Sequence, residues 1–119
     1  MKLGSGAYEG AFSFKSRFEN GTGTNPEELI AAAHAGCFSM ALSNALAKAG
    51  TPPETLETKA EVTFQPGEGI TKIALTVRGT VPGIDEDGFR EAAEGAKDGC
   101  PVSQAVTGVP EITVEATLA

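Results

Sequence analysis

The longest run of apolar residues in the chain lies over positions 29–46, where few polar side chains interrupt it. Asn25 suits the cap before a helix, and Pro26 suits its first position. Gly50 suits its end, with prolines soon after. The pattern therefore predicts a helix over 26–49. A helix without a polar face is buried, so we expect this one at the centre of the protein.

The central helix also predicts the oligomeric state. A chain of 119 residues has little other material to cover a helix that is apolar on nearly every side. Small side chains over 31–36 would let a second backbone approach closely. We therefore expect a homodimer in which the partner covers this helix.

Alternating apolar and polar positions predict the strands. Even spacing of Phe12, Phe14 and Phe18 indicates a strand over 7–18. Positions 56–65 alternate as well, and a glycine-rich turn separates them from 70–81, which predicts a hairpin. Positions 109–118 alternate as a last strand.

Two further helices complete the predicted fold, an amphipathic one over 85–99 and a short one over 101–106. The sum is a single domain over 1–119 of the α+β class, with an antiparallel sheet around the long buried helix.

Composition excludes several kinds of partner. The net charge of −7 and the pI near 4.6 argue against nucleic acid and anionic membranes, which require basic surfaces. We expect no apolar stretch of membrane-spanning length and no signal peptide in the first residues. A cytoplasmic protein is predicted. In that compartment two cysteines are more often catalytic, redox-active or simply buried than joined in a structural disulfide.

The two cysteines have different settings. Cys37 lies inside the central helix, whereas Cys100 precedes Pro101 and therefore caps the short helix that follows. Such a pair suits an attacking and a resolving thiol. The alternative for each is a small buried hydrophobic residue. Cys37 lies too far from its helix N-terminus for the dipole to activate it, so a reactive thiolate requires a cation, and Arg17 is the nearest upstream arginine.

His34 stands one helical turn before Cys37, which raises the hypothesis of a nucleophile and its base. A lone histidine in an alanine-rich helix is more often a core or interface residue. His34, Cys37 and Cys100 lack a fourth ligand and close CxxC pairs, so no metal site is predicted. Glu27 opens the central helix, where a carboxylate stabilises the dipole and has the further option of holding an arginine.

The segments 24–29, 32–40 and 99–103 together resemble the OsmC/Ohr family of osmotically inducible and organic hydroperoxide resistance proteins. The resemblance is closer to the OsmC branch, because proteins of the Ohr branch tend to carry a different residue at the position of His34. It covers nearly the whole chain. The family usually begins with some additional residues, so the chain is expected to lack the first N-terminal strand.

The resemblance implies an intertwined homodimer that reduces organic hydroperoxides to alcohols without metal, haem or flavin. By position, Cys37 matches the peroxidatic cysteine and Cys100 the resolving one. Glu27 matches the catalytic glutamate, and Arg17 matches the arginine of the OsmC branch. An external dithiol is implied as reductant, with lipoyl groups of proteins as its source.

Helix geometry places a condition on this assignment. Ten residues along a straight helix separate Glu27 from Cys37 by about 15 Å. The two share a site only where the helix breaks or the partner subunit supplies Glu27, so we expect active sites at the subunit interface. A non-enzymatic dimer, either a redox sensor or a small-ligand carrier, is the alternative function, and a Cys/His hydrolase ranks third.

Overall fold

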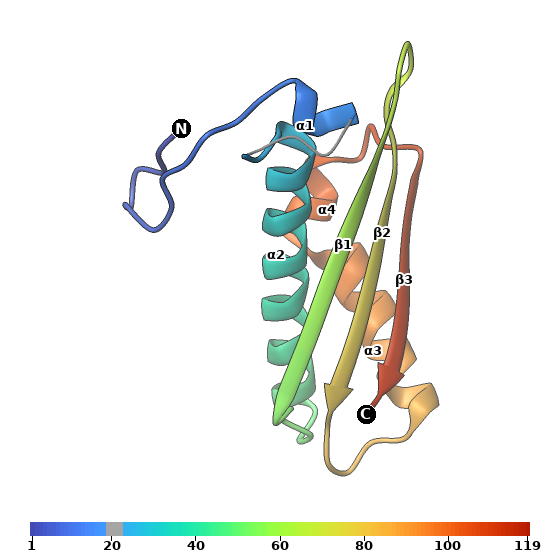
Figure 1. The fold of residues 1–119 in the computed structure, drawn as a ribbon. Helices are drawn as coiled ribbons and strands as arrows, with labels where there is room; N and C mark the ends of the chain where they lie inside the picture. Colours follow the sequence, from blue (N-terminus) through green and yellow to red (C-terminus); the bar gives the residue numbers. More distant parts are fainter. Residues whose placement is uncertain (19–22) are drawn as a thin grey trace.

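The computed structural model describes residues 1–18 and 23–119, without the side chains of Arg17 and Phe18. The elements appear in this order (Figure 1): α1 Lys15–Phe18, α2 Pro26–Lys48, β1 Thr55–Gln65, β2 Gly69–Thr80, α3 Glu86–Gly99, α4 Pro101–Ala105 and β3 Glu111–Leu118.

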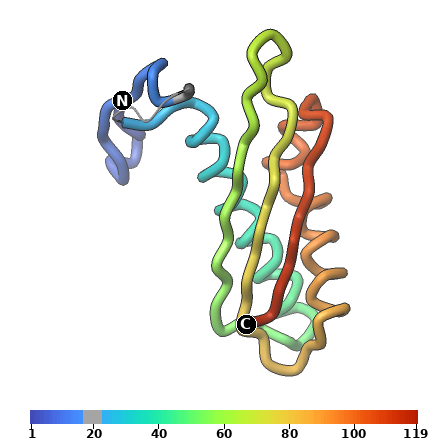
Figure 2. The backbone as a smooth tube through the Cα atoms, turned by 45° about the vertical axis from the view of Figure 1, so that its right-hand side comes forward, coloured from blue at the N-terminus to red at the C-terminus, as the bar shows by residue number. Residues whose placement is uncertain are grey.

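The three strands form one sheet in the order β1-β2-β3. The hairpin of β1 and β2 is antiparallel, as predicted, but β3 pairs with β2 in parallel. The prediction of an antiparallel sheet was therefore wrong at its last strand. The chain leaves β2 and returns through α3 and α4, and such a helical crossover brings the next strand back in the same direction. Figure 2 shows α2 and the pair α3 and α4 together on one face of this sheet.

The predicted helix boundaries are confirmed. The side chain of Asn25 accepts a hydrogen bond from the Glu28 backbone N–H at 2.8 Å, and α2 ends before Gly50, whose φ of 89° places it in the left-handed region. Asp85 caps α3 in the same way, accepting from the Gly88 N–H at 2.8 Å. Local capping chemistry alone located these helices.

The core lies between the sheet and the inner face of α2. Phe38, Leu42 and Leu46, four residues apart, are buried against β2 and α3 together with other apolar side chains. The opposite side of α2 faces solvent in the single chain, where Met40 is 76% exposed. The prediction of a buried central helix is thus confirmed for one face of it.

α2 corrects a second expectation. This helix of 23 residues contains an 18-residue stretch with a mean hydropathy of 1.4. By length and composition, the helix could therefore cross a membrane. Core helices of soluble proteins pass the same test. Here α2 packs along β1 and against α3, which is the arrangement of a core helix.

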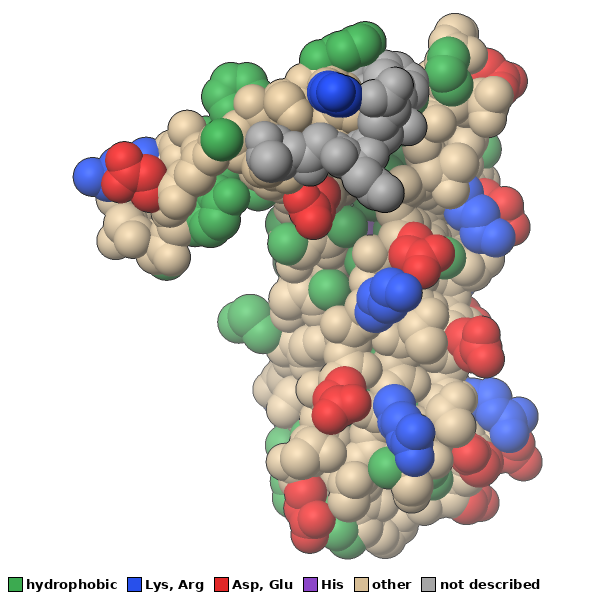
Figure 3. Space-filling view, in the orientation of Figure 1, with side chains coloured by type: hydrophobic (Ala, Val, Ile, Leu, Met, Phe, Trp, Pro, Cys, Tyr) green, Lys and Arg blue, Asp and Glu red, His purple; other side chains and the backbone are tan. Residues whose placement is uncertain are grey.

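The strand predicted over 7–18 is wrong. This segment has isolated bridges, among them Phe12 with Thr24, and ends in the helical turn α1. Even spacing of phenylalanines indicates a strand only where another strand pairs with it, and Phe12 is 64% exposed in the single chain. The segment extends away from the body of the fold in Figures 1 and 2, and Figure 3 shows hydrophobic side chains exposed along it.

Candidate active site

The fold brings the two cysteines together. Cys37 lies on α2 and is partly buried, whereas Cys100 lies between α3 and α4 and is fully buried. Both thiols are free. Although they stand far apart in the sequence, they lie close enough for each to shift the pKa of the other, and such proximity is what disulfide formation requires.

Cys100 owes its position to the junction of two helices. Its backbone is extended, with φ −65° and ψ 128°, because Pro101 excludes helical geometry at the preceding residue. Its N–H donates to the carbonyl of Ala96 at the end of α3, and its carbonyl accepts from the N–H of Gln104 in α4. The cysteine thus ends one helix and begins the next, as the sequence predicted.

The hydrogen bond between the thiols has opposite effects on the two. It raises the pKa of Cys37, and burial adds to this, while the backbone N–H of Val102 counteracts part of the rise. Burial alone would raise the pKa of Cys100, but hydrogen bonds from Cys37 and from the start of α4 lower it overall. Within one chain the pKa of the partly buried thiol is thus raised and that of the fully buried thiol is lowered.

His34 is fully buried, and its Nε2 lies 2.6 Å from the hydroxyl oxygen of Ser103. Burial lowers the pKa of His34, so the ring is neutral near neutral pH. Its hydrogen-bond partner is Ser103 rather than Cys37, which gives no support to the Cys/His hydrolase. Sequence reasoning missed Ser103. Its signal was a hydroxyl one turn after Cys100 on the same short helix.

This burial makes stability depend on pH. In the unfolded chain His34 binds a proton below about pH 6.5, whereas the folded state resists protonation until a lower pH, so folding stability falls as pH drops through this window. We expect a lower urea midpoint at about pH 5.5 than at about pH 7.5. His34→Gln should flatten this difference. An equal difference in the variant would mean that other groups cause it.

Glu27 is not brought to Cys37 within one chain. Glu27 is buried in the first turn of α2, and the helix is unbroken, so about 15 Å of helix separates it from Cys37. Arg17 lies in α1, but its side chain is outside the described part of the structure. Among the described residues, no group of three or more His, Cys, Asp or Glu side chains is placed to hold a metal ion.

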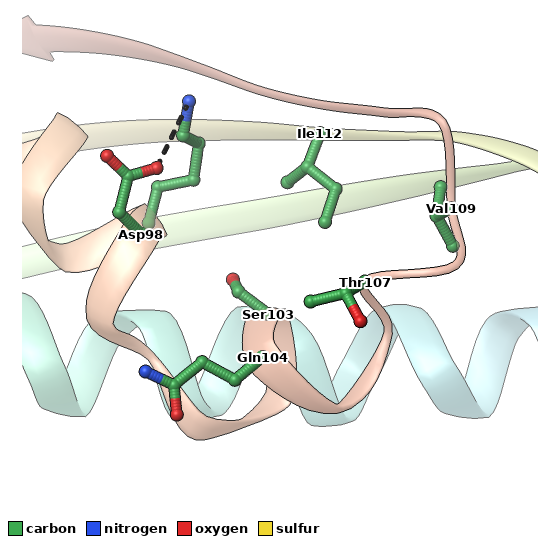
Figure 4. Close-up of a pocket in the computed structure, with 7 residues that line it drawn as sticks. Asp98, Ser103, Gln104, Thr107, Val109 and Ile112 are labelled. Carbon is green, nitrogen blue, oxygen red and sulfur yellow. Dashed lines mark ion pairs between the residues drawn. The ribbon is translucent and has the colours of Figure 1, made fainter.

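A cavity of about 310 Å³ lies between the end of α3, α4 and β3. Figure 4 shows Ser103 of α4 and Thr107, which follows that helix, together with the apolar Val109 and Ile112 around it. Ser103 therefore faces this space and also contacts the buried His34.

These observations define a class, namely α+β proteins with two free thiols in contact beneath a long core helix. The particular family follows from the sequence: the sequence model of the OsmC family, described as OsmC-like protein, matches residues 19–115. The chain belongs to this family, as its motifs indicated.

The most similar relatives agree. Peroxiredoxin OsmC of Escherichia coli (strain K12) is 50% identical over 107 residues, covering 87% of this chain and 73% of that protein. An organic hydroperoxide resistance protein of Xanthomonas axonopodis pv. citri is 33% identical, covering 79% of this chain and 67% of that protein. The higher identity with the first agrees with the resemblance to the OsmC branch.

Solved structures agree on the fold. A putative organic hydroperoxide resistance protein of Vibrio cholerae, with captopril bound in one of its active sites, superimposes with a TM-score of 0.76 at 26% identity, covering 98% of this chain and 81% of that one. An OsmC protein of Legionella pneumophila gives a TM-score of 0.71 at 21% identity, covering 99% of this chain and 86% of that one.

Proposed function

We propose that this protein is a cysteine-based peroxidase that reduces organic hydroperoxides to alcohols and protects against oxidative stress. The observation that carries the proposal is the pair of free, neighbouring thiols Cys37 and Cys100, the first partly buried and the second fully buried. The names of the relatives, peroxiredoxin OsmC and organic hydroperoxide resistance protein, support the same reaction.

The reaction has two chemical steps. The Cys37 thiolate attacks the distal peroxide oxygen, the O–O bond breaks, and the leaving alkoxide takes up a proton to become the alcohol. Cys37 is now a sulfenic acid. The Cys100 thiolate then attacks the Cys37 sulfur, the S–O bond breaks, and the hydroxide released takes up a proton to become water. An external dithiol reduces the resulting disulfide by thiol–disulfide exchange.

The partly buried Cys37 is the sulfur that an incoming peroxide reaches, whereas Cys100 is fully buried. Because the hydrogen bond to Cys100 raises the pKa of Cys37, the first step requires a cation that favours its thiolate. We assign this role to Arg17, with Glu27 orienting the guanidinium through a bidentate pair.

Arg17→Ala is therefore expected to raise the pKa of Cys37 by about one unit or more, because an opposite charge is lost beside the thiolate. Ultraviolet absorbance of the thiolate in a Cys100→Ser background measures the Cys37 titration alone. Arg17→Lys, which keeps the charge, is the matched control. An unchanged titration curve in Arg17→Ala would remove the residue from this role.

A homodimer accounts for both the exposed apolar surface and the position of Glu27. Phe12 and Met40 are 64% and 76% exposed in the single chain, and the partner subunit would cover such side chains. The partner would also bring its Glu27 to Cys37, which α2 prevents within one chain. Sedimentation equilibrium would show a mass twice the 12.1 kDa of the chain, and a monomer with full activity would contradict this arrangement.

The reaction suits a cytoplasmic location, where dithiols that reduce the disulfide are abundant. Lipoyl groups carried by proteins are the dithiol that we propose, and no cofactor is required. The substrate class, organic rather than hydrogen peroxide, fits an apolar approach to Cys37 that includes the exposed Met40 of α2, whereas Phe38 is fully buried in the core and does not line it.

Multiple turnover tests the function. Reduced protein mixed with excess cumene hydroperoxide and dihydrolipoamide should consume many equivalents of peroxide, with a Cys37–Cys100 disulfide found by mass spectrometry between cycles. Hydrogen peroxide should react more slowly. Failure to consume more than one equivalent with several dithiols would argue against an enzyme.

A redox sensor is the second candidate, because it would use the same pair of free thiols. A sensor forms the same disulfide once and stops, so the count of turnovers separates the two functions.

A further inference from the structure

We propose that His34 and Ser103 form a buried hydrogen-bond relay that holds Cys100 ready to resolve oxidised Cys37, with His34 acting as a positioning residue. The inference rests on the proposed two-cysteine chemistry and adds two residues to it. The relay runs from His34 on α2 through the Ser103 hydroxyl on α4 to the Cys100 sulfur.

Geometry fixes the middle of the relay. Ser103 stands three residues after Cys100, on the first turn of α4, where the side chain of the third helical residue is within reach of the cap residue. Consistent with this, Ser103 contributes to lowering the pKa of Cys100. The Ser103 oxygen also lies 2.6 Å from His34 Nε2. His34 and Cys100 are 0% exposed and Ser103 is 6% exposed, so little water reaches these contacts.

Donor and acceptor counting sets the direction of the relay. A serine hydroxyl has a single hydrogen, and a thiolate is only an acceptor, so Ser103 donates to Cys100 and must accept from His34. This requires a neutral imidazole with its hydrogen on Nε2. His34 Nδ1 has no hydrogen-bond partner among the described residues. With the hydrogen on Nε2, the unpartnered Nδ1 is a hydrogen-bond acceptor. A buried acceptor without a partner is less unusual than a buried N–H without one.

The relay matters most in the second step. Before oxidation, both Cys37 and Ser103 lower the pKa of Cys100. Once Cys37 is a sulfenic acid, its thiol hydrogen is gone, and the Ser103 hydroxyl remains as the side-chain donor to the attacking thiolate. Losing that donor should therefore slow disulfide formation more than the attack on peroxide.

The first test uses the unaltered, reduced protein. His34 is the single histidine of the chain, so nitrogen-15 NMR reports its tautomer without assignment ambiguity. We expect the hydrogen on Nε2 at neutral pH. A hydrogen on Nδ1 would overturn the relay, whether or not the protein reduces peroxides.

The second test separates the two chemical steps by rapid quenching after one equivalent of cumene hydroperoxide. Dimedone traps the Cys37 sulfenic acid, and mass spectrometry counts the disulfide. Ser103→Ala and His34→Leu should slow disulfide formation by about tenfold or more while leaving sulfenic acid formation nearly unchanged. Ser103→Thr and His34→Gln retain the hydroxyl and an N–H donor, and should restore most of the rate. Equal slowing of both steps, or of neither, would overturn the proposal.

Absence of any sulfenic acid would contradict the proposed function, and a titration tests the relay independently of that outcome. In a Cys37→Ser background, thiolate absorbance reports Cys100 alone, and Ser103→Ala should raise its pKa. Cys37 on α2 is an ionisable group that acts on this sulfur, and the Cys37→Ser background removes it. Lys97 and Asp98 of α3 line the neighbouring cavity and pair with each other at 3.7 Å. An unchanged Cys100 titration would overturn the relay.

Discussion

Cys37→Ser is expected to abolish peroxide turnover, with a loss on the order of a thousandfold or more, as when other enzymes lose their nucleophile. A serine hydroxyl stays protonated at neutral pH and cannot form a sulfenic acid, so neither step proceeds. Because serine is nearly the size of cysteine at this half-buried position, the fold should persist. Peroxide consumption followed by ferrous oxidation, together with circular dichroism of the variant, measures both.

Cys100→Ser is the matched control, because it removes the other thiol of the same hydrogen-bonded pair. We expect it to consume about one equivalent of peroxide and then to slow, with the sulfenic acid trapped by dimedone at Cys37. Full turnover in Cys37→Ser, or sulfenic acid found at Cys100, would reverse the roles assigned here. The second outcome is a sharp one, since within one chain Cys100 has the lowered pKa.

The parts of the fold that the sequence predicts well are those determined by local chemistry. Asn25 and Asp85 cap their helices through their own side chains, and Pro101 forces the extended backbone at Cys100. Each effect acts within a few residues, so the pattern is visible without the fold. The hairpin of β1 and β2 is predictable for the same reason, because a glycine turn sets it.

What the sequence predicts poorly depends on distant partners. The direction of β3 follows from the path through α3 and α4, not from the alternation of its residues. The segment around Phe12 resembles a strand, yet it has only isolated bridges, because no neighbouring strand in the described part of the chain completes a ladder with it.

The candidate site shows the same division. Cys37 and Cys100 stand out by their settings in the sequence, and family motifs assign them roles. Ser103 does not stand out, because its importance arises only when α4 packs against α2 and brings its hydroxyl to His34. The contact between the two thiols likewise depends on packing.

Phe89→Ala should cause the largest loss of stability, about 3–5 kcal/mol in the free energy of unfolding. The ring is fully buried between α3 and the sheet, in the same cluster as Phe38 and Leu75. It lies directly over Gly79 of β2, where an added Cβ would meet the ring at 3.0 Å. The sheet is therefore shaped to receive this side chain, and removing it leaves a cavity that neighbouring residues cannot fill.

Such a loss is a large share of the free energy of unfolding of a typical domain, which is about 5–15 kcal/mol. The variant would therefore be partly unfolded at physiological temperature. Urea unfolding at one fixed protein concentration measures the change, since dimerisation makes apparent stability depend on concentration. Phe89→Leu is the graded control and should cost about 1 kcal/mol, because it keeps most of the volume. Equal stability of Phe89→Ala and the parent protein would mean that the packing of α3 on the sheet contributes little. In that case, the packing of α3 on the sheet would not be what holds Cys100, at the end of α3, near Cys37. The support of the thiol site would have to come from α2.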